Sequence, residues 1–155
     1  MYYDTIAEGY DELHKEEQLK KLQFIAVRCQ PHGLLLDLGA GTGIAANFFS
    51  ANTTAIAVDP SVKLLEQYQG LKVLAKAECL PFKDHVFDTV ISLTALHLTD
   101  WQKSWKEIKR VAKPNALIVL TFLAQAKNVP SRIYGFQKMI CGPDIMFIKD
   151  IGHRK

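Results

Sequence analysis

Five short, continuous apolar runs, separated by stretches with helical periodicity, constrain the fold of this chain more than any other feature. The apolar runs lie at 34–36, 55–58, 71–74, 87–92 and 116–122. The helical stretches lie at about 11–29, 44–50, 62–68 and 101–112. Short apolar runs of this kind are typical of strands buried on both faces. Their alternation with helices predicts right-handed crossovers and a doubly wound, mostly parallel α/β sheet.

The ends of the predicted helices carry ordinary start and stop signals. Pro31 and Gly33 follow the first helical stretch and end it. The last stretch begins after Asp100, a residue type that caps helix N-termini, and it stops before Pro114. Residues 1–10 precede the first helix and are expected to be irregular.

The C-terminal residues 123–155 allow two interpretations. Segments 134–140 and 145–148, separated by a Gly-Pro turn, favour an antiparallel hairpin that closes one edge of the sheet. A helix over 131–140 is the alternative. In either case little chain remains for a full helix between the fifth and sixth strands.

Length, charge and cysteine spacing limit the classes of function. The 155 residues predict a single domain over 1–155. The net charge of +3, from 19 basic and 16 acidic residues scattered along the chain, neither requires nor excludes an RNA substrate. Cys29, Cys79 and Cys141 lack zinc-site spacing, which predicts isolated thiols in a reducing compartment and no metal site. The start of the chain lacks a signal-peptide pattern, and the longest apolar stretch is too short for a bilayer. We therefore expect a soluble, cytoplasmic protein without membrane contact.

A glycine-rich loop follows the first predicted strand directly and reads DLGAGTG at residues 37–43. Alternating glycines let the backbone turn sharply and let a ligand approach without obstruction by Cβ atoms. The start of the next helix offers unpaired N–H groups to a polar part of the ligand. In open α/β sheets, ligands bind beyond the carboxyl ends of the strands, where the strand order reverses. This loop is therefore the expected binding site.

Two acidic residues flank the loop and indicate the type of ligand. Asp59 follows the second strand, where a carboxylate can accept both hydroxyls of a ribose. The alternative is that Asp59 caps the helix that begins near Ser61, and the two roles are compatible. The loop also fits the dinucleotide fingerprint G-x-G-x-x-G/A, which leaves NAD open as a ligand. Asp37 is poorly placed against a pyrophosphate but well placed near a cationic amino group, which favours S-adenosylmethionine.

With these motifs in place, the sequence resembles the class I S-adenosylmethionine-dependent methyltransferases, in particular the group that includes the ubiquinone- and menaquinone-biosynthesis type. The matching segments are YYDTIAEGYDELH (2–14), LLLDLGAGTG (34–43), AIAVDPS (55–61), AECLPFKDHVFDTVISLTALHLTD (77–100) and KEIKRVAKPNALIVLTF (106–122). They stand in the expected order and cover most of residues 2–122. The resemblance implies a Rossmann-like methyltransferase fold with S-adenosylmethionine as cofactor.

The resemblance also implies roles for the residues around the glycine loop. Gly39 and Gly41 would bind the methionine part of the cofactor, and Asp37 would lie near its ammonium group. Asp59 would hold the ribose hydroxyls. Tyr10 resembles the aromatic residue of the lead segment that closes over the cofactor in this family.

Further cofactor contacts are implied after the third and fourth strands. Ala77 and Glu78 lie where family members contact the adenine, and Ser92 and Leu93 would line the methionine side. Lys76 departs from the family, which usually has an acidic residue here that accepts a hydrogen bond from the adenine amino group. Because lysine has no acceptor, either Glu78 replaces that residue, or backbone groups suffice, or cofactor affinity is reduced.

The acceptor of the methyl group is less constrained. His97 lies just past the fourth strand and is the candidate general base, although packing near Asp100 is an equally simple role. Residues 92–95 read SLTA and lack the Asn/Asp-Pro-Pro-Tyr/Phe motif of adenine and amide N-methyltransferases, which favours a small molecule or a tRNA as acceptor. An accessory subunit or a homodimer partner would supply the missing substrate wall. The alternatives are an NAD(P)-binding oxidoreductase and a non-catalytic methyltransferase-fold partner subunit.

Overall fold

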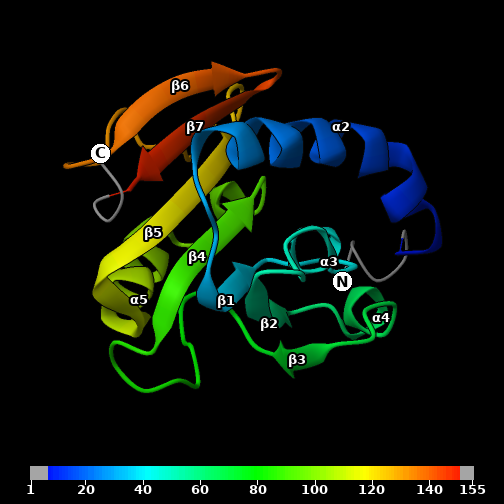
Figure 1. Cartoon of the computed structure of the whole chain (residues 1–155). Helices are drawn as coiled ribbons and strands as arrows, with labels where there is room; N and C mark the ends of the chain where they lie inside the picture. The colour runs from blue at the N-terminus through cyan, green and yellow to red at the C-terminus, as the bar shows by residue number, and fades with distance from the viewer. Residues whose placement is uncertain (1–6, 151–155) are drawn as a thin grey trace.

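The computed structural model describes residues 7–150, and of residues 7–14 only the helical backbone (Figure 1). The helices are α2 (Ala7–Arg28), α3 (Ile44–Phe48), α4 (Val62–Leu65) and α5 (Trp101–Val111), with a 3-10 turn, η1, at Leu96–Leu98. The strands are β1 (Gly33–Leu38), β2 (Thr53–Asp59), β3 (Leu71–Leu74), β4 (Phe87–Leu93), β5 (Ala112–Leu123), β6 (Gln137–Cys141) and β7 (Asp144–Lys149). They form one seven-stranded sheet in the order β3-β2-β1-β4-β5-β7-β6.

The first five strands are parallel, and β7 joins β5 in the antiparallel direction. This arrangement confirms the doubly wound, mostly parallel fold. The strand order reverses between β1 and β4, so the carboxyl ends of these two strands border the crevice where ligands bind in such folds.

Alternating residues of the central strands supply two separate cores. Leu36 of β1 and Val90 of β4 pack on the face that α5 covers. Leu35 and Ile91, one residue away in each strand, pack on the opposite face beneath α2 and α3. Because side chains alternate along a strand, both faces of each central strand must be apolar, which explains the continuous runs in the sequence.

The C-terminal hairpin is confirmed, and the alternative helix over 131–140 is wrong. β6 and β7 pair in the antiparallel sense, with Cys141 opposite Asp144. In Figure 1 the hairpin closes the sheet edge beside β5, and α2 runs next to it. The hairpin therefore brings the turn before Asp144 close to the first helix of the chain.

Several predicted boundaries move for local reasons. The first helix begins at Ala7, within the segment expected to be irregular. The helix predicted over 62–68 ends at Leu65, and the chain continues with tighter bonds such as Tyr68 N–H to the Leu65 carbonyl. β5 begins at Ala112 and takes up Pro114 where its pairing with β4 shifts register, a place that tolerates a residue without an N–H.

Candidate functional site

The glycine loop lies between the carboxyl end of β1 and the start of α3. Gly39, Gly41 and Gly43 all have positive φ, at 70°, 58° and 85°. A Cβ on Gly39 would lie 2.4 Å from the Ala95 Cβ, just after β4. The loop therefore needs glycine both for its backbone conformation and for its approach to the end of β4.

Asp59 holds this loop to the end of β2. Its Oδ2 accepts a hydrogen bond from the Gly41 N–H at 2.9 Å, and its Oδ1 accepts one from the Ser61 N–H at 2.9 Å. Ser61, and not Asp59, is the N-cap of α4, because its hydroxyl accepts from the Leu64 N–H. A carboxylate has about four lone-pair sites, so it can accept hydrogen bonds from several donors at once.

Asp37 lies beneath the loop and is almost fully buried. Its Oδ2 accepts a hydrogen bond from the Ala46 N–H at 3.0 Å, which anchors the short helix α3. Burial raises the pKa of Asp37 to about 7; the Ala46 hydrogen bond opposes this rise, and the charge of Asp59 adds to it. Asp37 thus supports the loop from inside, and its predicted approach to an ammonium group stays a prediction.

Tyr68 covers the other side of the loop and was not singled out in the sequence. A Cβ on Gly43 would lie 2.3 Å from the Tyr68 ring. The charge of Asp37 contributes to a raised pKa of the Tyr68 hydroxyl, after the larger effect of burial. In the sequence, Tyr68 is the last residue of the helix predicted over 62–68. A tyrosine at that place is equally consistent with ordinary packing, so its contact with the glycine loop could not be predicted.

The segment expected near the adenine forms a tight turn after β3. Lys76 and Cys79 make an isolated antiparallel bridge, and Ala77 is buried between them. The Glu78 Oε2 accepts a hydrogen bond from the Asp100 N–H at 3.2 Å. This hydrogen bond connects the turn with the start of α5. The other carboxylate oxygen of Glu78 can still accept a hydrogen bond.

Three buried polar atoms near the carboxyl ends of β4 and β5 have no hydrogen-bond partner among the described residues. They are Ser92 Oγ, His97 Nδ1 and Asp144 Oδ1. Buried polar groups are nearly always paired, so each such atom needs an explanation. Of these, Ser92 Oγ lies 3.9 Å from the position of a Cβ on Gly39, in the glycine loop.

His97, the candidate base, lies in η1 and is partly buried. Burial lowers its pKa, and the negative charge of Asp144 opposes that shift. Its ring is therefore neutral near pH 7 and able to accept a proton. The alternative role, packing near Asp100, stays a prediction as well, since η1 ends at Leu98, two residues before Asp100. Tyr10 lies in α2, but its side chain is outside the described residues.

A buried ion pair near His97 was missed by the sequence reasoning. Lys21 of α2 and Asp144 of β7 are 3% and 0% exposed, and Lys21 Nζ lies 3.0 Å from Asp144 Oδ2. Thr94, just after β4, accepts from Lys21 Nζ at 2.8 Å and donates to Asp144 Oδ2 at 2.5 Å. Thr94 has a φ of 52°, which is rare for a β-branched residue. The ion pair joins the first helix to the last strand, and nothing in the local sequence marks it.

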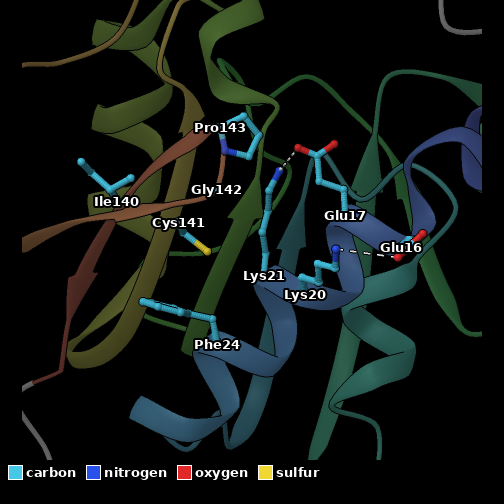
Figure 2. Close-up of a pocket in the computed structure, with 9 residues that line it drawn as sticks. All are labelled: Glu16, Glu17, Lys20, Lys21, Phe24, Ile140, Cys141, Gly142 and Pro143. Atoms are coloured by element: carbon cyan, nitrogen blue, oxygen red, sulfur yellow. Dashed lines mark ion pairs between the residues drawn. The ribbon is translucent and has the colours of Figure 1, made fainter.

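A pocket of about 590 Å³ opens between α2 and the β6–β7 turn (Figure 2). Its charged side is formed by two pairs one helical turn apart, Lys20 with Glu16 and Lys21 with Glu17. Its apolar side is formed by Phe24, Ile140, Cys141, Gly142 and Pro143. Lys21 also pairs with the buried Asp144, at a shorter distance than with Glu17. The pocket therefore combines a charged side with an apolar wall.

Comparison with known proteins identifies the family. A family described as a methyltransferase domain matches residues 36–120, more than half of the chain. The chain belongs to this methyltransferase-domain family. The match includes the glycine loop, Asp59 and the whole of β4, so it covers the core of the candidate site. This confirms the resemblance to the class I S-adenosylmethionine-dependent methyltransferases.

Individual relatives agree with the assignment. An uncharacterized protein of Methanocaldococcus jannaschii is 29% identical over 127 residues, and the match covers 77% of this chain and 49% of that protein. The demethylmenaquinone methyltransferase of Mycobacterium marinum is 30% identical over 144 residues, 85% of this chain and 62% of that enzyme. The chain thus spans about half to two-thirds of the length of these relatives.

Solved structures show the same fold. A Methanococcus maripaludis protein, proposed in its description to be an S-adenosylmethionine-dependent methyltransferase, has a TM-score of 0.79 at 14% identity, covering 98% of this chain and 94% of that one. A protein proposed in its description to be a methyltransferase, in complex with the Haloferax volcanii Trm112 methyltransferase activator, has a TM-score of 0.72 at 20% identity, covering 77% of this chain and 59% of that one. At these identities the likeness concerns the fold alone.

Two further observations concern metals and membranes. Within residues 15–150, no group of three or more His, Cys, Asp or Glu side chains is arranged to hold a metal ion. No helix in the described part of the chain combines the length and apolar character needed to cross a membrane.

Proposed function

We propose that this chain binds S-adenosylmethionine in the loop between Asp37 and Asp59 and transfers its methyl group to a small-molecule or tRNA acceptor. The observation that carries the proposal is the Asp59 carboxylate, which is fixed by the Gly41 N–H at the carboxyl end of β2. It stands where a ribose is held in nucleoside-binding folds, next to a loop without Cβ atoms at Gly39 and Gly41.

The residues of the loop fit this cofactor better than a dinucleotide. Asp37 and Asp59 place two acidic groups beneath and beside the loop, and they are close enough that the charge of Asp59 adds to the burial that raises the pKa of Asp37. A pyrophosphate would add negative charge there, whereas a ligand with an ammonium group would offset it. Ser92 Oγ, buried and unpartnered near Gly39, supplies one more group for a polar ligand.

When bound, S-adenosylmethionine supplies an electrophilic methyl group on sulfur. The protein residues then have three tasks. Asp59 orients the ribose as a hydrogen-bond acceptor, and Ala77 and Glu78 border the adenine side. Leu93, buried at the end of β4, helps to exclude water from the methionine side. These contacts restrict the reactants to a productive arrangement, which is the main contribution of such a protein.

His97 is the proposed general base. Its Nδ1 is buried and unpartnered, so it can accept a proton from an O–H or N–H of the acceptor. A base is needed for an oxygen or carbon acceptor, and less so for an amine that is already neutral. A His97→Gln variant should therefore lower the transfer rate and leave cofactor affinity unchanged.

An accessory subunit or a second copy of the chain is part of the proposal. The description of the Haloferax volcanii methyltransferase names an activator as its partner, which supports this suggestion by analogy of fold. Sedimentation of the purified chain, alone and with candidate partners, tests it.

The cofactor is tested by calorimetry with S-adenosylmethionine, S-adenosylhomocysteine and NAD. We expect the two sulfur compounds to bind and NAD not to bind. Asp59→Ala should abolish binding, while Asp84→Ala, a change at an exposed carboxylate in the Arg110 ion pair, should not. Binding of NAD alone would favour an oxidoreductase. Binding of the sulfur compounds without any transfer to metabolite or tRNA pools would favour a non-catalytic subunit.

A further inference from the structure

The positive charge of this chain is concentrated in its last third. Residues 1–100 contain 8 basic and 13 acidic residues, whereas residues 101–155 contain 11 basic and 3 acidic residues. The two parts therefore have net charges of −5 and +8, which together give the +3 of the whole chain. A charge asymmetry of this kind is typical of proteins that bind a polyanion or an anionic membrane.

Six exposed cations of the last third form a surface that we call the basic face. Three lie on α5, at a spacing that places them along one side of the helix, and three lie between the end of β5 and the first residues of β6. They are Lys103, Lys106, Lys109, Lys127, Arg132 and Lys138. In Figure 1, α5 lies beside β4 and β5, on the face of the sheet away from α2.

Side-chain contacts hold the two parts of the basic face together. The centroid of the Trp105 ring, on α5, lies 5.3 Å from Lys109 Nζ and 5.6 Å from the centroid of the Phe136 ring. Asn128 Nδ2 donates a hydrogen bond at 2.7 Å to the Thr99 carbonyl, just before α5. The chain after β5 is thus packed along α5, and its cations continue the row of lysines on the helix.

The carboxylates of α5 and β7 already have other partners. Glu107, on α5, pairs with Arg110 at 2.9 Å, and Arg110 also pairs with Asp84. Asp144, at the start of β7, is fully buried and pairs with Lys21. The basic face therefore keeps an excess of positive charge, which attracts anions.

An exposed aromatic ring lies within the basic face. Tyr134 is 91% exposed and follows Arg132 by two residues. Lys138 Nζ donates a hydrogen bond at 2.7 Å to the Ser131 carbonyl, so Lys138 and Arg132 belong to the same loop as the ring. An exposed aromatic ring among cations is an arrangement on which an unpaired base stacks while the neighbouring phosphates contact the charged groups.

The basic face is poorly suited to a bilayer or to duplex DNA. Binding at a membrane surface needs an apolar helix side that enters the lipid, but the apolar side of α5 carries Ile108 and Val111 into the core. The bases of a duplex stack on each other and cannot stack on Tyr134 unless they leave the helix. RNA offers unpaired bases in its loops and ends.

We propose that the basic face binds single-stranded RNA, with phosphates on its lysines and arginine and one base stacked on Tyr134. This inference goes beyond the proposed function, because binding on the outer side of α5 requires neither the cofactor nor methyl transfer. One end of the basic face lies close to the candidate site, since the Asp100 N–H, at the start of α5, donates to Glu78.

Fluorescence anisotropy of a labelled oligouridine of about 12 nucleotides tests this proposal in the intact chain without cofactor. Titrations at about 50 to 200 mM potassium chloride should show saturable binding that weakens as the salt concentration rises. Tyr134→Ala should weaken oligouridine binding about fivefold or more, because the stacking of one base is lost. The same variant should leave the binding of a DNA duplex of equal length unchanged, and Tyr134→Phe should bind oligouridine as the wild type does.

A second variant tests the phosphate contacts. Lys103→Gln/Lys106→Gln should reduce the slope of log Kd against log salt by about 1.4, since each phosphate contact on a single strand contributes about 0.7. Lys20→Gln/Lys63→Gln is the matched control, because it removes the same charge from exposed lysines on α2 and α4, and it should leave the slope unchanged.

The proposal is overturned if the wild-type chain does not bind oligouridine saturably, or if Tyr134→Ala binds it with wild-type affinity. Equal changes of slope in the two lysine double variants would overturn it as well, because binding would then depend on net charge alone. Vesicles of phosphatidylserine and phosphatidylcholine, tested by co-sedimentation, should not retain the chain. Retention that is lost in Lys103→Gln/Lys106→Gln, without oligouridine binding, would make the basic face a membrane surface and contradict the proposal.

Discussion

The close approach of Gly39 to the end of β4 makes a quantitative prediction. In Gly39→Ala the new Cβ would lie 2.4 Å from the Ala95 Cβ at a φ of 70°. Positive φ costs a non-glycine residue about 1 kcal/mol, and overpacking of a buried contact costs about 1–3 kcal/mol more. We therefore expect the free energy of unfolding to fall by about 2–4 kcal/mol, measured by urea denaturation followed by circular dichroism.

Two matched variants separate these contributions. Gly135 has a φ of 83° and nothing within 4 Å of a Cβ, so Gly135→Ala should lose only about 1 kcal/mol. The double variant Gly39→Ala/Ala95→Gly removes the clash and should lose only about 1 kcal/mol relative to Ala95→Gly alone. If Gly39→Ala is no less stable than Gly135→Ala, the argument that the loop packs directly on the end of β4 is refuted.

Three further predictions concern the buried polar groups. The pKa of Asp37 is raised to about 7, so between about pH 4 and pH 7 the folded state binds more protons than the unfolded state. The stability that protonated Asp37 contributes is therefore complete below about pH 4 and is lost as pH rises through about 7. Asp37→Asn should remove this pH dependence in urea denaturation curves recorded from pH 4 to 8, and parallel curves for the two proteins would contradict the assignment. Thr94→Gly should be more stable than Thr94→Ala by about 1 kcal/mol, the reverse of the usual order, because the site has a positive φ; the usual order would argue against strain at Thr94. The His97 ring should titrate below its ordinary pKa of 6.5 in NMR spectra, and a higher midpoint would mean that the charge of Asp144 outweighs burial.

The sequence was sufficient for the parts of the molecule that depend on local chemistry. Continuous apolar runs predicted the parallel strands because both faces of those strands are covered. Asp59 and the glycine loop were recognisable because both lie at the carboxyl end of a strand, where ligands bind in open parallel sheets. The Asp100 cap was predicted because capping depends on a single side chain, and the structure shows it accepting from the Lys103 N–H.

The features that were missed depend on contacts between distant segments. Lys21 looks like one of several lysines on the exposed side of the first helix, and Asp144 looks like an ordinary turn residue. Their pairing arises only when the β6–β7 hairpin folds back against β5 beside α2. The positive φ of Thr94 could not be predicted either, because a β-branched residue gives no local indication of that conformation. The depth of Asp37 beneath the loop also follows from tertiary packing, since the sequence shows only its place before the first glycine.

The most direct test of the central claim is residue-resolved binding of S-adenosylhomocysteine to the glycine loop. In ¹H–¹⁵N spectra of the purified chain, we expect the amides of Gly39, Gly41 and Gly43 to shift saturably on titration, with the Gly135 amide unchanged as an internal reference. Loop amides that remain unmoved at millimolar S-adenosylhomocysteine would contradict the account.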